Sequence, residues 1–305
     1  MKEVDGLKSE LLQVKNIVKN YGDNTVLKGV SFTVDNGEIF ALLRGNGTGK
    51  TTMLSCIEGI LKYDSGEISI MGYAPTSKQI RKNIGVQLQS TSLNDNITVL
   101  EALKLFSKWN KVKLNLELLN TFGLSSIKNK QYEQLSTGQK RRLHLALALV
   151  SNPKLIFLDE PTAGLDVEGR IALHQAIRDL KKEGKTIILA SHDMAEVEAL
   201  CDRIAILKGG TIVFTGTTEE ITSIYNNVVN VYVKTLNLIS NSYFKYIRLI
   251  NKESDYNIYS TSNIQEGLFE LLENIKSNDN NIIDIKIERP TLEDKFIEIS
   301  QEVKC

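Results

Sequence analysis

A glycine-rich turn at residues 44–49 constrains this chain more than any other feature. The apolar residues 39–43 before it predict a buried strand, and residues 53–57 after it predict a helix. A strand, a glycine-rich turn and a helix carrying Lys-Thr form a phosphate-binding loop, because backbone N–H groups and the positive end of the helix dipole point at an anion. We therefore expect Lys50 to reach the outer phosphates of a nucleotide and the Thr51 hydroxyl to bind Mg²⁺.

One position departs from this loop pattern. The pattern asks for glycine five residues before Gly49, and that position is Arg44. If the backbone there needs a conformation that only glycine adopts, a side chain costs about 1–2 kcal/mol. Nucleotide binding would then be weakened several-fold or more, and an Arg44→Gly substitution would tighten it.

Composition excludes several classes of protein. The 305 residues predict about two domains, and 37 basic against 37 acidic residues give no field that would attract nucleic acid. The three cysteines have neither metal-site nor redox spacing, which suits reduced thiols. No apolar run approaches the ~20 residues that cross a bilayer, and residues 1–5 lack the apolar core of a secretion signal. We expect a cytosolic protein.

The order of predicted elements indicates an α/β fold. Apolar strands at 155–158, 185–190 and 203–207 alternate with helices, which predicts a mainly parallel sheet covered on both faces. Residues 98–135 predict mostly helix and residues 137–150 a further helix, so a helical insertion spans about 90–150. The first domain covers 11–225.

A change of composition near residue 225 marks a domain boundary. The following stretch, 228–305, predicts a small α+β domain. Its expected elements are strands at 228–234, 244–250, 256–260 and 282–288, a helix around 264–275, and a second helix beginning near Pro290.

Two carboxylates end the buried strand at 155–158. Asp159 suits a water-mediated or outer-sphere contact to Mg²⁺, and Glu160 suits general-base activation of a water molecule. An isolated pair of this kind is more often two solvated acids at a strand end. The residues elsewhere in the chain therefore decide between these interpretations.

Four more positions could complete a nucleotide site. Ser136 fits as the N-cap of a helix that can hold an anion, or of an ordinary helix. His192 follows strand 185–190 and lies at the carboxyl edge of the sheet, where ligands bind in open α/β folds, although a lone histidine there is more often structural. Gln89 after strand 84–88 could touch Mg²⁺ or simply start a loop. Tyr21 could stack on a base, but a turn tyrosine is more often plain packing.

In this order and spacing the residues resemble the ATP-binding-cassette (ABC) ATPases over residues 11–225. Lys50 lies 109 positions before Asp159, and Ser136 lies 23 before it, as in that family. Residues 135–139 are similar to the family signature, with Thr137 in place of its second glycine. Residues 159–166 are similar to its acidic motif and the following D-loop. The resemblance implies a cassette with a mainly parallel core sheet, an antiparallel β subdomain and a helical subdomain.

The resemblance also implies roles for individual residues. ATP would lie between the loop of one copy and residues 136–138 of another in a head-to-tail dimer. Glu160 would polarise the attacking water, His192 would orient the γ-phosphate and Lys50 would hold it. Mg²⁺ would be supported by Thr51, Gln89 and Asp159. The positions assigned to the nucleotide are Tyr21, Gly45, Asn46, Gly47, Thr48, Gly49, Lys50, Thr51, Thr52, Gln89, Ser136, Thr137, Gly138, Gln139 and Asp166.

Residues 288–296 resemble the C-terminal accessory domain of drug- and antibiotic-export ATPases of the daunorubicin-resistance type. The implied function is an ATPase subunit that powers a separate integral membrane permease, gripped by the helical region 90–135, and exports a drug, antibiotic or peptide. It would work as a homodimer or with a related cassette, peripherally on the cytoplasmic side of the membrane. No nucleic acid is expected as a partner.

Two other functions stay open. Arg44 would suit a degenerate cassette that binds nucleotide or a partner with little turnover. A soluble cassette that acts on ribosomes or DNA is less favoured, because the chain carries a single cassette, no long coiled coil and a balanced charge.

Overall fold

The computed structural model describes residues 10–44, 49–87, 92–224, 228–237, 244–289, 291–294 and 296. Contacts within the chain divide it into two compact units, Met1–Gly216 and Thr217–Cys305. We describe each unit by itself. The domain ranges expected from the sequence, 11–225 and 228–305, stay a prediction.

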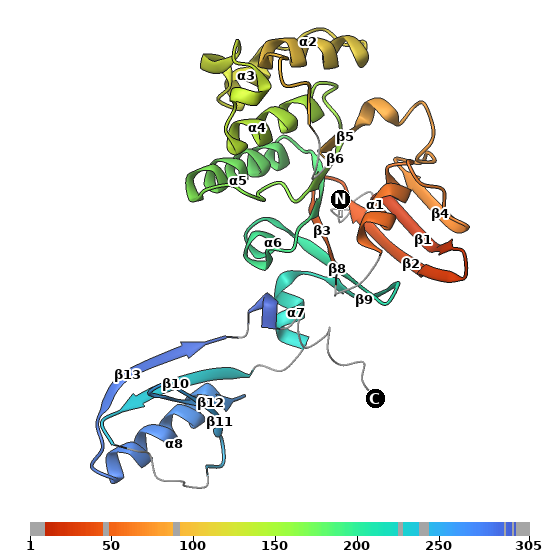
Figure 1. Cartoon of the computed structure of the whole chain (residues 1–305). Helices are drawn as coiled ribbons and strands as arrows, with labels where there is room; N and C mark the ends of the chain where they lie inside the picture. The colour runs from red at the N-terminus through yellow and green to blue at the C-terminus, as the bar shows by residue number, and fades with distance from the viewer. Residues whose placement is uncertain are drawn as a thin grey trace, which may run out of the picture. The chain divides into compact units, whose positions relative to one another are not determined.

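A six-stranded sheet forms the centre of the first unit (Figure 1). Its strand order is β5-β6-β7-β3-β8-β9, all neighbours being parallel except β9, which pairs antiparallel with β8. The strands are β3 (Ile39–Arg44), β5 (Ile84–Gln87), β6 (Leu155–Asp159), β7 (Thr186–Ala190), β8 (Arg203–Lys208) and β9 (Thr211–Gly216). The expected mainly parallel sheet is confirmed.

A second, antiparallel sheet packs over the first helix. Its order is β2-β1-β4, from β1 (Glu10–Tyr21), β2 (Asn24–Asp35) and β4 (Ser65–Ile70). Helix α1 (Lys50–Ile57) buries Met53 and Cys56 in one core with Phe40 and Leu42 of β3 and Leu12 of β1. This core therefore clamps α1 between the two sheets, which holds the start of the helix at the carboxyl end of β3.

Helices cover the opposite face of the parallel sheet. Figure 1 shows α4, α5 and α6 on the side of the sheet away from α1. They are α4 (Thr137–Ala148), α5 (Val167–Lys182) and α6 (Met194–Leu200). Every residue of β7 is buried, as expected for a strand covered on both faces.

The region expected to be mostly helical is interrupted by turns. It contains α2 (Val99–Trp109), α3 (Glu117–Thr121) and two short 3₁₀ turns, Ser125–Ile127 and Tyr132–Gln134; a further 3₁₀ turn, Arg81–Asn83, precedes β5. Helix α2 begins at Thr98, whose hydroxyl and the Glu101 carboxylate form a reciprocal capping box.

The second unit is a four-stranded antiparallel sheet with one long helix. The order is β11-β12-β10-β13, from β10 (Val229–Thr235), β11 (Arg248–Glu253), β12 (Tyr256–Thr261) and β13 (Ile282–Glu288), and the helices are α7 (Thr218–Ile224) and α8 (Ile264–Ser277). The strand expected at 244–250 was placed too early, because Phe244 and Ile247 pack into the core beside Tyr259 instead of pairing in the sheet. In the described residues no helix has the length and apolar character needed to span a membrane.

Gly85 allows strand β5 to pack directly against helix α4. A Cβ atom at this position would lie 2.4 Å from the carbonyl oxygen of Ala148 and 2.9 Å from Cγ of Pro153. The Ala148 oxygen belongs to the backbone of α4, so an added methyl group would have to displace the helix or the strand.

We predict that Gly85→Ala lowers the free energy of unfolding by about 1–3 kcal/mol, because the methyl overpacks the joint between β5 and α4. Urea denaturation measures the change. The matched control is Gly138→Ala, whose Cβ would meet Leu165 at an ordinary 3.6 Å and which should change stability by less than about 0.5 kcal/mol. Equal losses for the two variants would contradict the packing argument.

Candidate active site

Lys50 is the first residue of α1 at the carboxyl end of β3. Gly49 is the N-cap with φ 142°, a conformation that side-chain-bearing residues rarely adopt, and a Cβ there would lie 3.0 Å from Leu207. The carbonyl of Gly49 accepts a hydrogen bond from the N–H of Met53 at 2.7 Å. This geometry sets the lysine at the positive end of the helix, as a phosphate-binding loop requires. Residues 45–48, the rest of that loop, lie outside the described residues.

Glu160 is a buried carboxylate held by Lys50 and His192. Its Oε1 is 3.2 Å from Nζ of Lys50, and its Oε2 is 2.7 Å from Nδ1 of His192. The side chain is only 8% exposed. A carboxylate only accepts hydrogen bonds, so Nδ1 of the imidazole carries the proton. Because an unpaired charge at this depth would be costly, the lysine and the histidine account for the position of this glutamate.

The backbone at Glu160 is strained. Its φ is 49°, in the left-handed region, and its N–H donates to the carbonyl of Ala190 at 2.8 Å. Strained residues of this kind collect at functional sites, where the surrounding structure over-determines them. The strain turns the chain away from β6 directly after Asp159.

Asp159 lies beside the same lysine. Its Oδ1 is 4.0 Å from Nζ of Lys50. Burial raises the pKa of Asp159, and the Lys50 ammonium opposes this rise. Thr51 follows Lys50 in the first turn of α1 with an exposed side chain. A carboxylate and a hydroxyl beside a phosphate loop suit Mg²⁺, which commonly takes one or two protein ligands together with phosphate oxygens.

Interactions beneath His192 fix the segment that carries it. The Ser191 hydroxyl donates to Oε2 of Glu196 at 2.6 Å, and the N–H of Asp193 donates to the Ser191 oxygen at 3.1 Å. Asp193 is the N-cap of α6, and Glu196 is 1% exposed. The histidine side chain itself is 81% exposed. A buried anchor below an exposed imidazole leaves that imidazole accessible to a substrate.

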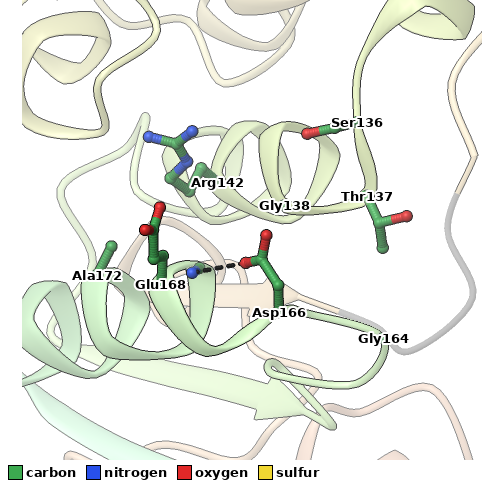
Figure 2. Close-up of a pocket in the computed structure, with 9 residues that line it drawn as sticks. Ser136, Thr137, Gly138, Arg142, Gly164, Asp166, Glu168 and Ala172 are labelled. Carbon is green, nitrogen blue, oxygen red and sulfur yellow. Dashed lines mark hydrogen bonds between the residues drawn. The ribbon is translucent and has the colours of Figure 1, made fainter.

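A second group of predicted residues lies around a cavity of about 480 Å³ (Figure 2). Ser136 caps α4, and Asp166 caps α5 by accepting the Gly169 N–H at 2.8 Å. The N-cap expected at Ser136 is therefore confirmed, with Gln139 completing a capping box. The residues that line the cavity are Ser136, Thr137, Gly138, Arg142, Gly164, Asp166, Glu168, Gly169 and Ala172.

The cavity and the Lys50 cluster are two separate groups of residues. None of Lys50, Asp159, Glu160 and His192 lines the cavity. The beginnings of α4 and α5 both border it, with Ser136 and Asp166 as their N-caps. Figure 2 shows the Arg142 and Glu168 side chains over the same cavity.

Sequence reasoning missed several residues of these groups. Arg142, Glu168 and Glu196 were not expected, although Glu196 stands three residues after a capping Asp193, which is a capping pattern. Arg142 lies on α4 shortly after the signature, and no sequence signal separates it from its basic neighbours. Its Nη1 donates to the carbonyl of Phe122 at 3.2 Å.

The structure leaves two other expected site residues, Tyr21 and Gln89, untested. Tyr21 is the last residue of β1, 51% exposed, with the Lys19 ammonium 5.4 Å from its ring centre. Gln89 lies outside the described residues. Tyr21 and Gln89 therefore stay predictions.

A glycine-only conformation is not required at Arg44. It is the last residue of β3, and its backbone pairs with Leu207 of β8 in the parallel register. Extended backbone is open to every residue type, so the strain considered from the sequence does not arise at this position.

The fold and the Lys50 cluster are those of a phosphate-loop nucleotide hydrolase. Comparisons with known proteins specify the family. Residues 27–163 match the family described as "ABC transporter". The chain is 31% identical to the linearmycin resistance ATP-binding protein LnrL of Bacillus subtilis over 306 residues, which covers 95% of this chain and 98% of LnrL. It is 34% identical to the lantibiotic transport ATP-binding protein SrtF of Streptococcus pyogenes, covering 72% of this chain and 97% of SrtF.

Solved structures agree. An ATP-binding cassette of an ABC transporter in its ADP conformation superposes with a TM-score of 0.63 at 27% identity, covering 70% of this chain and 92% of that one. The chain belongs to the ABC transporter ATPases, the nucleotide-binding proteins in which ATP hydrolysis is coupled to transport.

We predict that Arg44→Gly changes the dissociation constant for ATP by less than about threefold, because the extended backbone at this position gains nothing from glycine. A fluorescent ATP analogue titrated against both proteins measures it. Binding tightened tenfold or more would show that the arginine does strain the loop.

A second prediction concerns Glu58, the C-cap of α1. Burial, and secondarily the Asp159 charge, raise its pKa from 4.5 to about 7. The folded protein therefore holds this proton more tightly than the unfolded chain, and the resulting stability is present below pH 4.5 and lost as pH rises through 7.

Glu58→Gln removes that charge, so it should raise the free energy of unfolding at pH 8 by about 1–3 kcal/mol and leave it nearly unchanged at about pH 4.5. Urea denaturation at the two pH values tests this. An equal effect at both would show that the carboxyl group does not titrate in this range.

Proposed function

We propose that this chain is the ATP-hydrolysing subunit of an exporter whose membrane permease is a separate polypeptide. The observation that carries the proposal is the Glu160 carboxylate, buried between Lys50 and His192 at the carboxyl edge of the parallel sheet. In this role Glu160 accepts a proton from the attacking water, while Lys50 stabilises charge on the γ-phosphate. His192 orients that phosphate through the nitrogen that Glu160 does not engage.

Two copies of the chain complete each ATP site in this proposal. The Lys50 cluster supplies a cation and a carboxylate, and the cavity beside Ser136 supplies a second anion-binding helix start on a different part of the surface. A head-to-tail pair places the loop of one copy against residues 136–138 of the other, with Asp166 at the junction. A heteromeric cassette would serve the same geometry. Tyr21 stacks on the base, and residues 45–52 hold the phosphates.

Mg²⁺ fits the donor set beside Lys50. Thr51 and Asp159 would hold it, with Gln89 as a further oxygen donor, and the bound ion would supply charge neutralisation of the transferring phosphate.

The proposed cargo class follows the relatives. LnrL is named for linearmycin resistance and SrtF for lantibiotic transport, so export of an antibiotic, drug or peptide is the function we infer. The match to LnrL extends over both units of the chain, which supports the exporter subgroup. The permease partner would hold the protein peripherally on the cytoplasmic side of the membrane.

We predict that Glu160→Gln lowers steady-state ATP hydrolysis by about 100-fold or more, since the amide cannot accept the proton of the attacking water. ATP affinity should be retained, because the substituted side chain has nearly the same size and shape. Phosphate release measures the first and a fluorescent ATP analogue the second.

The matched control is Glu67→Gln, an exposed glutamate of β4 that should leave hydrolysis unchanged. Hydrolysis that survives in Glu160→Gln would reject this residue as the base. A wild-type protein that binds ATP without hydrolysis would favour the degenerate cassette.

A further inference from the structure

Strand β13 leaves a row of isoleucines uncovered at an edge of the second sheet. Within the described residues it pairs with β10 alone. Ile283, Ile285 and Ile287 are 56%, 38% and 46% exposed, and the register with β10 shifts at Ile283, between Asp284 and Ile282. An edge strand with free backbone groups and an apolar row is a template for pairing with another strand.

The exposed row belongs to the face that forms the domain core. Ile285 and Ile287 lie opposite Val233 and Val231 of β10, and directly opposed residues of antiparallel strands share a face. Those two valines are fully buried with Leu271 of α8. The core of this face therefore continues onto β13 but is not covered there.

Helix α8 adds to the same apolar surface. Phe269 and Leu272 are 65% and 43% exposed. Leu272 and Ile282, the first residue of β13, line one hollow of about 390 Å³, so this side of the helix borders the strand. An apolar row of this kind, next to free backbone groups, is typical of an interaction site.

We propose that β13 pairs antiparallel with β13 of a second copy of this chain, about a two-fold axis at Ile285. This pairing places Asp284 opposite Lys286 of the second copy in two symmetry-related pairs, Ile283 opposite Ile287, and Ile282 opposite Glu288. The two isoleucine rows would then form one strip on one face of a continuous sheet. The two-fold axis closes the assembly at two copies.

Neighbouring registers lack this complementarity. To keep both isoleucine rows on one face, the two-fold axis must pass through a residue position. That residue then lies opposite the same residue of the second copy. Centred on Lys286, Asp284 would oppose Glu288, which is repulsive. Centred on Asp284, Lys286 would oppose Ile282 and gain no ion pair. The charge pattern therefore selects Ile285.

At the other edge of the sheet, a self-pairing of β11 centred on its exposed isoleucine is not complementary in charge. In β11 a pairing centred on Ile250 would place Arg248 opposite Lys252, two like charges. This makes Ile250, which is 52% exposed, a matched control position.

The association involves no nucleotide and is separate from the proposed ATP-dependent pairing of cassettes. Sedimentation equilibrium of the full-length protein without nucleotide tests it. We expect reversible dimers, an apparent dissociation constant raised about tenfold by Ile285→Lys, and no change in Ile250→Lys.

Charge exchange tests the register. Asp284→Lys and Lys286→Asp should each weaken the dimer about tenfold, and the double variant should restore it, because two symmetry-related pairs change together. Circular dichroism and thermal unfolding confirm that each variant is folded.

A wild-type protein that stays monomeric at its highest soluble concentration would overturn the proposal, as would dimers that the β13 variants leave unchanged. Mg-ATP should still associate Glu160→Gln in the Ile285→Lys background. Loss of that association alone would instead count against the proposed ATP sandwich.

Discussion

The burial of the Glu160 carboxylate is the constraint on which the site depends. A charge at this depth needs a cation and hydrogen-bond donors beside it, and its partners Lys50 and His192 come from two other segments of the chain. One lies at the start of α1 and the other after β7. The three segments meet only where neighbouring parallel strands end together. The site therefore exists only when the sheet is complete.

The packing of the first unit fixes the positions of the helices that carry the site residues. Helix α1 lies clamped between the antiparallel sheet and the parallel sheet, so the beginning of α1 cannot move independently of β3. On the other face, Gly85 allows α4 to approach β5, and α4 carries Ser136 at its start. Both helix starts are thus fixed by buried contacts rather than by exposed loops.

In the second unit the helix covers only part of the sheet. Its core is small, with α8 covering β10 and β12 through Leu271 and Ile275 while β13 extends beyond the helix. One helix of 14 residues on a four-stranded sheet does not cover every strand. The apolar side chains of β13 are consequently left for another surface to bury, and their alternation with charges specifies which surface fits.

Short-range patterns in the chain were enough to establish the α/β class, the buried strands and the local chemistry, because apolar runs, glycine turns and capping pairs act over a few residues. They predicted the strand end at Asp159 and Glu160, the N-cap at Ser136 and the position of His192 after β7, although they began the strand of 248–253 four residues early. Only the folded chain shows that Lys50 meets Glu160, that Arg142 and Glu168 border the cavity, and that Arg44 is an extended strand residue. Those facts depend on which strands become neighbours and how deeply each side chain is buried, and both are properties of the whole sheet rather than of any short stretch of chain.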